Sequence, residues 1–320
     1  MKRINPKYIP LAATALVMIA LYVLGCLLYP NFGSLRVVVN LFGDNAFLGI
    51  AAVGGTFVIL SGGIDLSVGA VIAFIGILIA SLISGGMPPM VAIALALVVG
   101  TVFGAAQGSL IRFFDLPPFL VTLGGMFLMR GLAFVVRAES LAIKHRFYQQ
   151  TIRQLAIPLA PRIAIPFTAI CFIAVVIVAT YICIYTRFGR NVYSIGSSEN
   201  SALLMGVPVG STKIGIYALA GFFSALAGCV STFYMQSGNP ASFVGLELDA
   251  IAAVVIGGTL LTGGVGFVPG TLMGVLILGL IQTLITFQGN LNTWWTKIAI
   301  GVLLLLFIVL QKSISGARRA

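Results

Sequence analysis

The sequence predicts an all-α membrane protein, a polytopic bundle of about ten transmembrane helices with two Gly-interrupted repeat elements. Three observations support this fold class. The 320 residues are 60% hydrophobic and only 8% charged, whereas charged residues make up about 25% of soluble domains. Apolar runs of about 20 residues, the length that spans a bilayer, recur from end to end. One Gly-rich apolar pattern also occurs twice, once in each half of the chain.

The repeated pattern pairs residues 50–69, IAAVGGTFVILSGGIDLSVG, with residues 251–270, IAAVVIGGTLLTGGVGFVPG. In both, a hydroxyl residue and two glycines interrupt an apolar run before a second run begins. The glycines at these two breaks are Gly62, Gly63, Gly263 and Gly264. Paired Gly-interrupted segments in the two halves of a membrane protein indicate a transport site near the bilayer midplane. The alternative is that these glycines only allow close helix packing.

The first half, residues 1–136, contains expected crossings at residues 9–29, 41–60, 66–84, 90–111 and 119–136. Each ends where the sequence turns polar or carries Gly and Pro, which interrupt helices. The separating sequences are PNFGSLRVVVN, SGGID, GGMPP and RFFDLPP. A mixed, amphipathic segment at residues 137–163 follows, and we expect it to lie outside the membrane.

The second half, residues 164–320, contains expected crossings at residues 164–185, 214–235, 248–261, 267–287 and 298–310. They are separated by a polar stretch at residues 186–213 and by QSGNPASFVGLE, TGGVG and FQGNLNTWWTK. The two tryptophans of the last separator suit a membrane interface. We therefore expect a single transmembrane domain over residues 1–320, with both repeat elements running in the same direction.

The distribution of Lys and Arg predicts that both termini are cytoplasmic, because cytoplasmic loops of membrane proteins are enriched in these residues. With that topology, ten Lys and Arg residues lie on cytoplasmic segments, seven on external segments and Arg130 within a crossing. Five cations in residues 137–163 run against the rule. A re-entrant Gly-Gly segment would change the number of crossings.

Composition also excludes several classes of function. The net charge of +11 comes mostly from span ends, so topology and anionic membrane lipid explain it better than nucleic acid does. Four cysteines without C-x-x-C spacing and a single histidine offer no disulfide framework, metal site or catalytic triad. No phosphate-binding G-x-x-x-x-G-K-[ST] sequence occurs. We expect no enzyme activity and no cofactor in this chain.

The few acidic residues are the first candidates for a substrate pathway, because ionised side chains inside a bilayer are costly. Asp65 follows the first break and can either cap the next helix or bind substrate hydroxyls. Glu247 and Asp249 precede the second repeat element as Asp44 and Asn45 precede the first, so they are candidate caps as well. The candidate pathway residues are Asn45, Asp65, Glu247 and Asp249. One of the carboxylates is a candidate partner for Arg130.

Residues 186–213, TRFGRNVYSIGSSENSALLMGVPVGSTK, contain the signals of a short helix. Ser198, Glu199 and Asn200 can cap a helix over residues 201–205, and Gly206 with Pro208 ends it. A short capped helix on the cytoplasmic face suits contact with a partner protein. The alternative is a plain connector.

This polar stretch and the two repeat elements resemble the permease subunits of bacterial ribose-type sugar ABC importers. The matching sequences lie at residues 56–69, 186–207 and 247–274, so the resemblance covers both halves. Within that family, DNAFLGIAAVG at residues 44–54 and WWTKIAIGVLL at residues 294–304 resemble the galactofuranose permease type.

The resemblance implies import of a monosaccharide across the bacterial inner membrane by alternating access. It also implies cytoplasmic ATPase subunits that hold ATP and Mg, a second permease copy or sister permease, and a periplasmic sugar-binding protein. The residues implied to couple to the ATPase are Gly196, Ser197, Glu199, Asn200, Ala202, Leu203 and Gly206. The chain departs from the family pattern in its Ser-Ser-Glu-Asn sequence at residues 197–200 and in Ser201-Ala202. An ion-coupled secondary carrier is the alternative from another class, although few ionisable residues are available to it.

Overall fold

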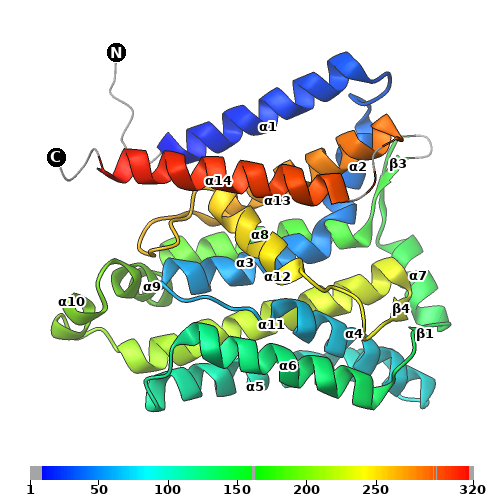
Figure 1. Ribbon diagram of the computed structural model, residues 1–320. Helices are drawn as coiled ribbons and strands as arrows, with labels where there is room; N and C mark the ends of the chain where they lie inside the picture. Colours follow the sequence, from blue (N-terminus) through cyan, green and yellow to red (C-terminus); the bar gives the residue numbers. More distant parts are fainter. Residues whose placement is uncertain (1–8, 161–162, 291, 293, 317–320) are drawn as a thin grey trace.

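The computed structural model describes residues 9–160, 163–290, 292 and 294–316. These residues form helices joined by short loops, with two small pairs of strands (Figure 1). The helices up to residue 160 are α1 (Ile9–Leu28), α2 (Leu35–Asp44), α3 (Ala46–Leu60), α4 (Val68–Ser84), α5 (Pro89–Phe113), α6 (Pro118–Val136) and α7 (Arg146–Gln154). Those of the second half are α8 (Phe167–Tyr185), α9 (Arg187–Ser197), α10 (Glu199–Leu204), α11 (Val209–Met235), α12 (Leu246–Ile256), α13 (Val268–Gln288) and α14 (Trp294–Gly316). The strands are β1 (Leu141–Ala142), β2 (Ile157–Ala160), β3 (Ile163–Ile165) and β4 (Ser237–Gly238).

The all-α membrane fold is confirmed. Six of the described helices are long and apolar enough to cross a membrane, or seven if α2 and α3 form one bent span. Helix α4 and the apolar part of α14, Trp294–Val309, are shorter apolar segments, and α12 has only 11 residues. Each expected crossing therefore falls on a helix, but two expectations were wrong in detail. The crossing at residues 41–60 is bent by 55° between α2 and α3, and that at residues 248–261 stops at Ile256.

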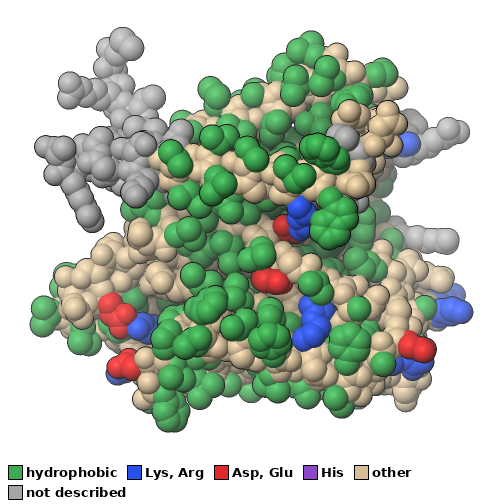
Figure 2. Space-filling view, viewed as in Figure 1, with side chains coloured by type: hydrophobic (Ala, Val, Ile, Leu, Met, Phe, Trp, Pro, Cys, Tyr) green, Lys and Arg blue, Asp and Glu red, His purple; other side chains and the backbone are tan. Residues whose placement is uncertain are grey.

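The bundle has two distinct ends (Figure 1). Helices α9 and α10 lie at one end, which we call the α10 end; α7 and the strands lie at the other, the α7 end. Figure 2 shows a largely hydrophobic face between these ends, with charged side chains gathered toward each end and a few between. This distribution fits a protein whose middle lies in lipid.

Helix α11 forms the centre of the bundle and packs most extensively against α5, α3 and α4. Close contact with α5 depends on glycine, since a Cβ at Gly104 would strike the Tyr217 carbonyl and one at Gly100 would strike Ala225. Small residues allow such approach of backbones in membrane helices. The largest buried apolar cluster draws residues from both halves of the chain, including Phe57 and Phe223.

The segment between α6 and α8 is fixed to the end of α11. Strand β1 pairs antiparallel with β4, which directly follows α11. On α7, the buried Tyr148 ring stacks on Phe233 at 4.3 Å between centroids, and its hydroxyl lies 3.1 Å from that of Thr232. Burial raises the pKa of Tyr148 to about 12, so this hydroxyl remains protonated and keeps its hydrogen bond at physiological pH. Strands β2 and β3 form a separate antiparallel hairpin.

Candidate functional site

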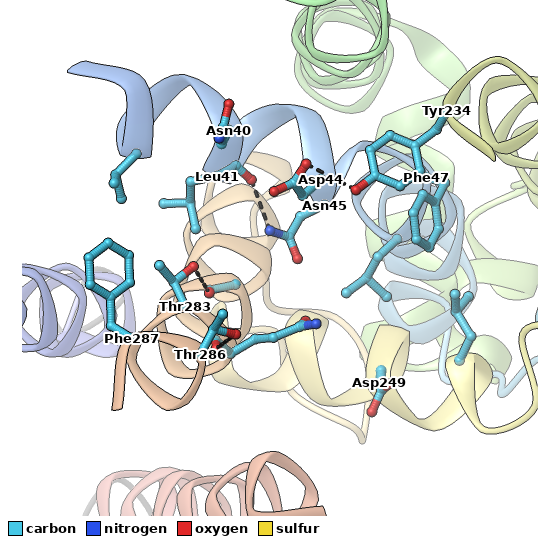
Figure 3. Close-up of a pocket in the computed structure, with 15 residues that line it drawn as sticks. Asn40, Leu41, Asp44, Asn45, Phe47, Tyr234, Asp249, Thr283, Thr286 and Phe287 are labelled. Carbon is cyan, nitrogen blue, oxygen red and sulfur yellow. Dashed lines mark hydrogen bonds between the residues drawn. The ribbon is translucent and has the colours of Figure 1, made fainter. Parts of the chain in front are cut away.

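A cavity of about 520 Å³ lies toward the α7 end, between α2, α3, α12 and α13 (Figure 3). Its volume is within the range of small-molecule sites, about 300–1,000 Å³. The lining combines polar side chains with aromatic rings: Asn40, Asp44, Asn45, Tyr234, Asp249, Gln282, Thr283 and Thr286, with Phe47 and Phe287. We call this space the outer cavity.

The bend between α2 and α3 forms one wall of the outer cavity. Asn45 lies at the bend, and its Nδ2 donates to the Leu41 carbonyl at 2.9 Å instead of capping α3. Its amide oxygen points into the cavity (Figure 3). Gly279 on α13 makes room for it, because a Cβ there would strike the Asn45 amide. The helix break therefore adds the Asn45 amide to a wall that already carries Asn40 and Asp44.

A hydrogen bond and a set of hydroxyls complete the outer cavity. The Tyr234 hydroxyl donates to Asp44 Oδ1 at 3.1 Å, which joins α11 to α2 (Figure 3). Thr283 and Thr286 donate to carbonyls of their own helix at 2.7 and 2.9 Å, so each hydroxyl oxygen can still accept. Carboxylate, amide and hydroxyl groups beside aromatic rings can bind a polyhydroxylated ring by hydrogen bonds and stacking.

A smaller pocket of about 200 Å³ adjoins the outer cavity and shares Asn45, Leu48, Asp249 and Gln282 with it. We call it the inner pocket. The Asp249 carboxylate points toward α14 (Figure 3), where Lys297 Nζ lies 2.7 and 2.5 Å from its two oxygens. Asp249 was a candidate cap of α12, and in the structure its carboxylate forms this ion pair.

The structure brings two of the four candidate pathway residues, Asn45 and Asp249, to the outer cavity. Asp65 lies elsewhere and is buried, with Oδ1 accepting from the backbone N–H and hydroxyl of Ser67 at 2.8 and 2.7 Å. Ser67 occupies the cap position of α4, so the expectation that Asp65 is the cap was wrong by two residues. Glu247 accepts from the Gly245 N–H at 3.1 Å, as a residue closing the start of α12. Substrate contact stays a prediction for all four.

Arg130 is held by backbone oxygens. Its Nη1 donates to the carbonyls of Pro240 and Ser242 at 2.6 and 2.7 Å. No ion pair to Arg130 occurs within the described residues. The guanidinium therefore fixes the loop that precedes α12, and with it the first turn that carries Asp249.

The two glycine breaks meet each other at the α10 end. The Gly264 N–H donates to the Leu60 carbonyl at 2.9 Å, and a Cβ at Gly263 would lie 2.8 Å from the Gly62 nitrogen. Glycine is required by conformation as well, since φ is +82° at Gly62, +83° at Gly263 and +74° at Gly264. Gly63 packs under Tyr217 instead. Contact between the breaks is consistent with repeat elements that run in the same direction.

Helix α9 covers both breaks. A Cβ at Gly196 would strike the Leu60 carbonyl and the Gly264 nitrogen, and Ser197 lies against Gly264. The structure thus brings two of the predicted coupling residues into direct contact with the predicted hinge glycines.

The short helix expected in the polar stretch is present as α10. The Ser198 hydroxyl oxygen accepts from the Ser201 N–H at 3.3 Å, and Gly206, with φ +78°, follows the last turn. The helix begins at Glu199, two residues earlier than expected, and Glu199 pairs with Lys213 at 2.7 Å. The part of the polar stretch before it, for which no helix was predicted, is the 11-residue helix α9.

Helix α10 presents apolar side chains to its surroundings. Ala202 is fully buried, whereas Leu203, Leu204 and Met205 are 62%, 89% and 71% exposed. Asn200 is exposed beside them. This row of exposed apolar residues, at an end of the molecule outside the apolar spans, can bind another protein.

Sequence reasoning missed most of the outer cavity. Asp44 was weighed only as a cap, and the polar residues of α13 were absorbed into an apolar span. A signal was present, since Gln282, Thr283 and Thr286 place three polar side chains within two turns of a largely apolar helix. Tyr234 and Lys297 stood at span ends, where polar residues are ordinary.

These features define the class of protein. The bundle of membrane helices has a polar cavity toward one end. At the other end the two glycine breaks are in contact, and a helix is exposed for a partner. This is the arrangement of a transport permease. No group of His, Cys, Asp and Glu that could hold a metal occurs among the described residues.

Comparison with known proteins identifies the family. The chain belongs to the family described as branched-chain amino acid transport system / permease component, whose profile matches residues 37–308. It is 50% identical to the inner membrane ABC transporter permease protein YjfF of Escherichia coli K12 over 94% of this chain and 92% of YjfF. It is 37% identical to the fructose import permease FruG of Bifidobacterium longum (98% and 93% covered). It is 36% identical to the ribose import permease RbsC of Bacillus subtilis (92% and 91% covered).

No solved structure matches the chain. The relatives are permease subunits of ABC transporters, so this chain is a membrane transport subunit and not an enzyme. None of these comparisons supports the ion-coupled carrier.

Proposed function

We propose that the chain is the permease subunit of an ATP-driven importer of a monosaccharide, galactofuranose or a related sugar. The observation that carries the proposal is the outer cavity, in which amide, carboxylate and hydroxyl groups lie beside aromatic rings. Neutral sugars are bound by such groups. Ribose and fructose are the substrates named for two relatives, which supports a sugar over an amino acid.

The two sequences that resemble the galactofuranose permease type also line this region. Residues 44–54 supply Asp44, Asn45 and Phe47 to the outer cavity, and residues 294–304 supply Lys297 to the inner pocket. The sequences that resemble this subgroup therefore lie beside the two spaces in which we propose that the sugar binds. This agreement supports the finer assignment.

The proposed mechanism is alternating access driven by partner ATPases at the α10 end, which would be cytoplasmic together with both termini. ATP and Mg would bind to the ATPase subunits and not to this chain. Closure of the ATPases would move α10 and α9, and α9 lies directly on the two breaks. The permease itself needs only contacts that differ between its two states.

The proposed assembly places two permease subunits, either two copies of this chain or this chain with a sister permease, in the bacterial inner membrane. A periplasmic sugar-binding protein would deliver substrate to the α7 end, where the outer cavity lies. Membrane lipid would surround the apolar middle.

The test is purification of the chain with the proteins that accompany it, followed by reconstitution in proteoliposomes with its binding protein. We expect an ATPase to copurify and to be lost when residues 201–205 are scrambled. Uptake of labelled galactose, ribose, fructose and leucine is then measured with and without internal ATP. ATP-dependent uptake of a sugar supports the proposal. Uptake without ATP, or uptake of leucine alone, contradicts it.

A further inference from the structure

The charged side chains that line the outer cavity and the inner pocket do not balance. The described lining residues include two carboxylates, Asp44 and Asp249, and one cation, Lys297. Lys297 Nζ lies beside both oxygens of Asp249, so these two side chains neutralise each other. No Lys or Arg in the described part of the chain forms an ion pair with Asp44. The two adjoining spaces therefore carry one uncompensated negative charge.

Asp44 can be reached from the outer cavity. It is the last residue of α2 and is exposed, and Figure 3 shows its carboxylate beside Asn45 on the cavity wall. Oδ1 accepts from the Tyr234 hydroxyl at 3.1 Å. No other side-chain hydrogen bond of Asp44 occurs within the described residues. An exposed carboxylate is ionised at neutral pH, so Asp44 offers the cavity both a negative charge and a free acceptor oxygen.

A charge in this position separates sugars by their own charge. A neutral sugar can donate a hydroxyl to the free oxygen of Asp44, in a charge-assisted hydrogen bond. A sugar that carries a carboxylate meets a like charge in a partly enclosed space, where repulsion is stronger than in bulk water. A sugar that carries an ammonium is attracted instead. Lys297 does not offset the repulsion, because Asp249 already holds its ammonium.

We propose that Asp44 is a specificity residue that excludes anionic sugars from the outer cavity and admits neutral and amino sugars. This inference rests on the proposed function, to which it adds the charge class of the substrate. The Asp249–Lys297 pair has a supporting role, since it prevents Asp249 from adding a second negative charge. Loss of Lys297 would therefore strengthen the exclusion, whereas loss of the Asp44 charge would relax it.

The test measures which sugars occupy the outer cavity in the reconstituted complex of permease and ATPase. The binding protein is left out, because its own selectivity would decide which sugar arrives. Thr286 on α13 lines the cavity and is exposed, so Thr286→Cys supplies a thiol for the uncharged reagent N-ethylmaleimide. Peptide mass spectrometry reads the rate of modification at residue 286 alone. A sugar that occupies the cavity slows this modification.

We expect galactose and galactosamine to protect the thiol, and galacturonate to require about tenfold higher concentration for equal protection, because only galacturonate is repelled. Asp44→Asn keeps the shape and removes the charge. It is expected to bring galacturonate to within about twofold of galactose and to weaken protection by galactosamine. A steric effect of the galacturonate carboxylate would not change galactosamine. Lys297→Met is expected to disfavour galacturonate further, and it provides the comparison if Asp44→Asn does not assemble.

Asp115→Asn is the matched control, because Asp115 is exposed between α5 and α6 and lines neither space. Equal protection by galactose and galacturonate in the wild type overturns the charge selection, and so does the absence of protection by every sugar. A ratio left unchanged by Asp44→Asn, or by Lys297→Met where only that variant assembles, overturns it as well. ATP-dependent sugar uptake with the binding protein present is measured separately, and its absence overturns the proposed function itself.

Discussion

At the scale of single residues, two adjacent glycines of α3 lie in opposite environments. A Cβ at Gly54 would lie 2.9 Å from the Phe223 Cβ and 3.5 Å from Ala220 on α11, whereas one at Gly55 would meet nothing within 4 Å. Gly54→Ala is expected to lower stability by about 1–3 kcal/mol, because the added methyl pushes α3 from α11. Gly55→Ala is expected to raise stability by up to about 1 kcal/mol, because alanine favours the helix over glycine and the added methyl meets no other atom.

The measurement is the midpoint of thermal unfolding of the purified protein in one detergent. The two variants change the same residue type on the same helix, so each serves as the control for the other. Equal midpoints would show that close contact between α3 and α11 does not constrain this position.

The type of a residue alone could not show whether it lines the substrate pathway or only stabilises the fold. Asn45 and Asp65 each stand next to a helix break, and both were candidates. The structure directs the Asn45 amide into the outer cavity and turns Asp65 onto Ser67. The difference depends on which helix faces each side chain, and no local pattern encodes that.

At the scale of elements, α10 carries the clearest surface for a partner. Leu204 is 89% exposed, and no packing inside the permease accounts for its apolar side chain. Leu204→Asp is expected to reduce ATPase copurification at least tenfold while thermal stability stays unchanged, because a charge would be buried in the contact. Ser211→Asp introduces the same charge at an exposed site of the same end and is expected to leave copurification intact. If the ATPase still copurifies with the Leu204→Asp variant, α10 is not part of the contact with the ATPase.

Arg130 supports a second element, the loop at residues 239–245. Its two bonds to backbone carbonyls, at 2.6 and 2.7 Å, are charge-assisted and contribute about 1.5–3 kcal/mol each. Arg130→Met is expected to loosen this loop, to increase its cleavage by protease several-fold and to reduce transport, because the loop leads into α12. Limited proteolysis with mass spectrometry locates the cleavage. Unchanged protection of residues 239–245 would contradict the role assigned to Arg130.

The contrast between α10 and α9 shows which elements the sequence could predict. Helix α10 is specified locally by the Ser198 cap and by Gly206 at its end. Helix α9 contains two glycines and several polar residues, and distant contacts hold it: the Tyr193 hydroxyl donates to the Gly266 carbonyl at 2.7 Å, and Val192 is fully buried. Tertiary packing overrides weak helix propensity there.

At the scale of the whole molecule, hydropathy predicted where the chain crosses and where it breaks, but not which crossings touch. Lipid is as apolar as a helix interior, so the buried and lipid-facing sides of a span carry similar residues. The meeting of residues 62 and 263 brings together positions about 200 apart in sequence. Such pairing depends on the packing of the complete bundle.

The proposed alternating access makes a prediction about α3 and α13. The hydroxyls of Thr56 and Thr271 lie 2.7 Å apart and both residues are fully buried near the breaks. Transport toward the α10 end requires the breaks to separate, and with them these two helices. Because the two hydroxyls face each other, we expect cysteines at both positions to be joined by oxidation into a disulfide.

We expect the oxidised Thr56→Cys/Thr271→Cys importer to lose transport and to regain it on reduction. Each single cysteine variant, oxidised in the same way, controls for the free cysteines of the chain, which include the buried Cys183 and Cys229. Loss of transport confined to the double variant would mean that α3 and α13 separate in every cycle. Full transport by a quantitatively cross-linked importer would instead show that sugar passes without parting these helices, and the breaks would then be packing positions and not hinges.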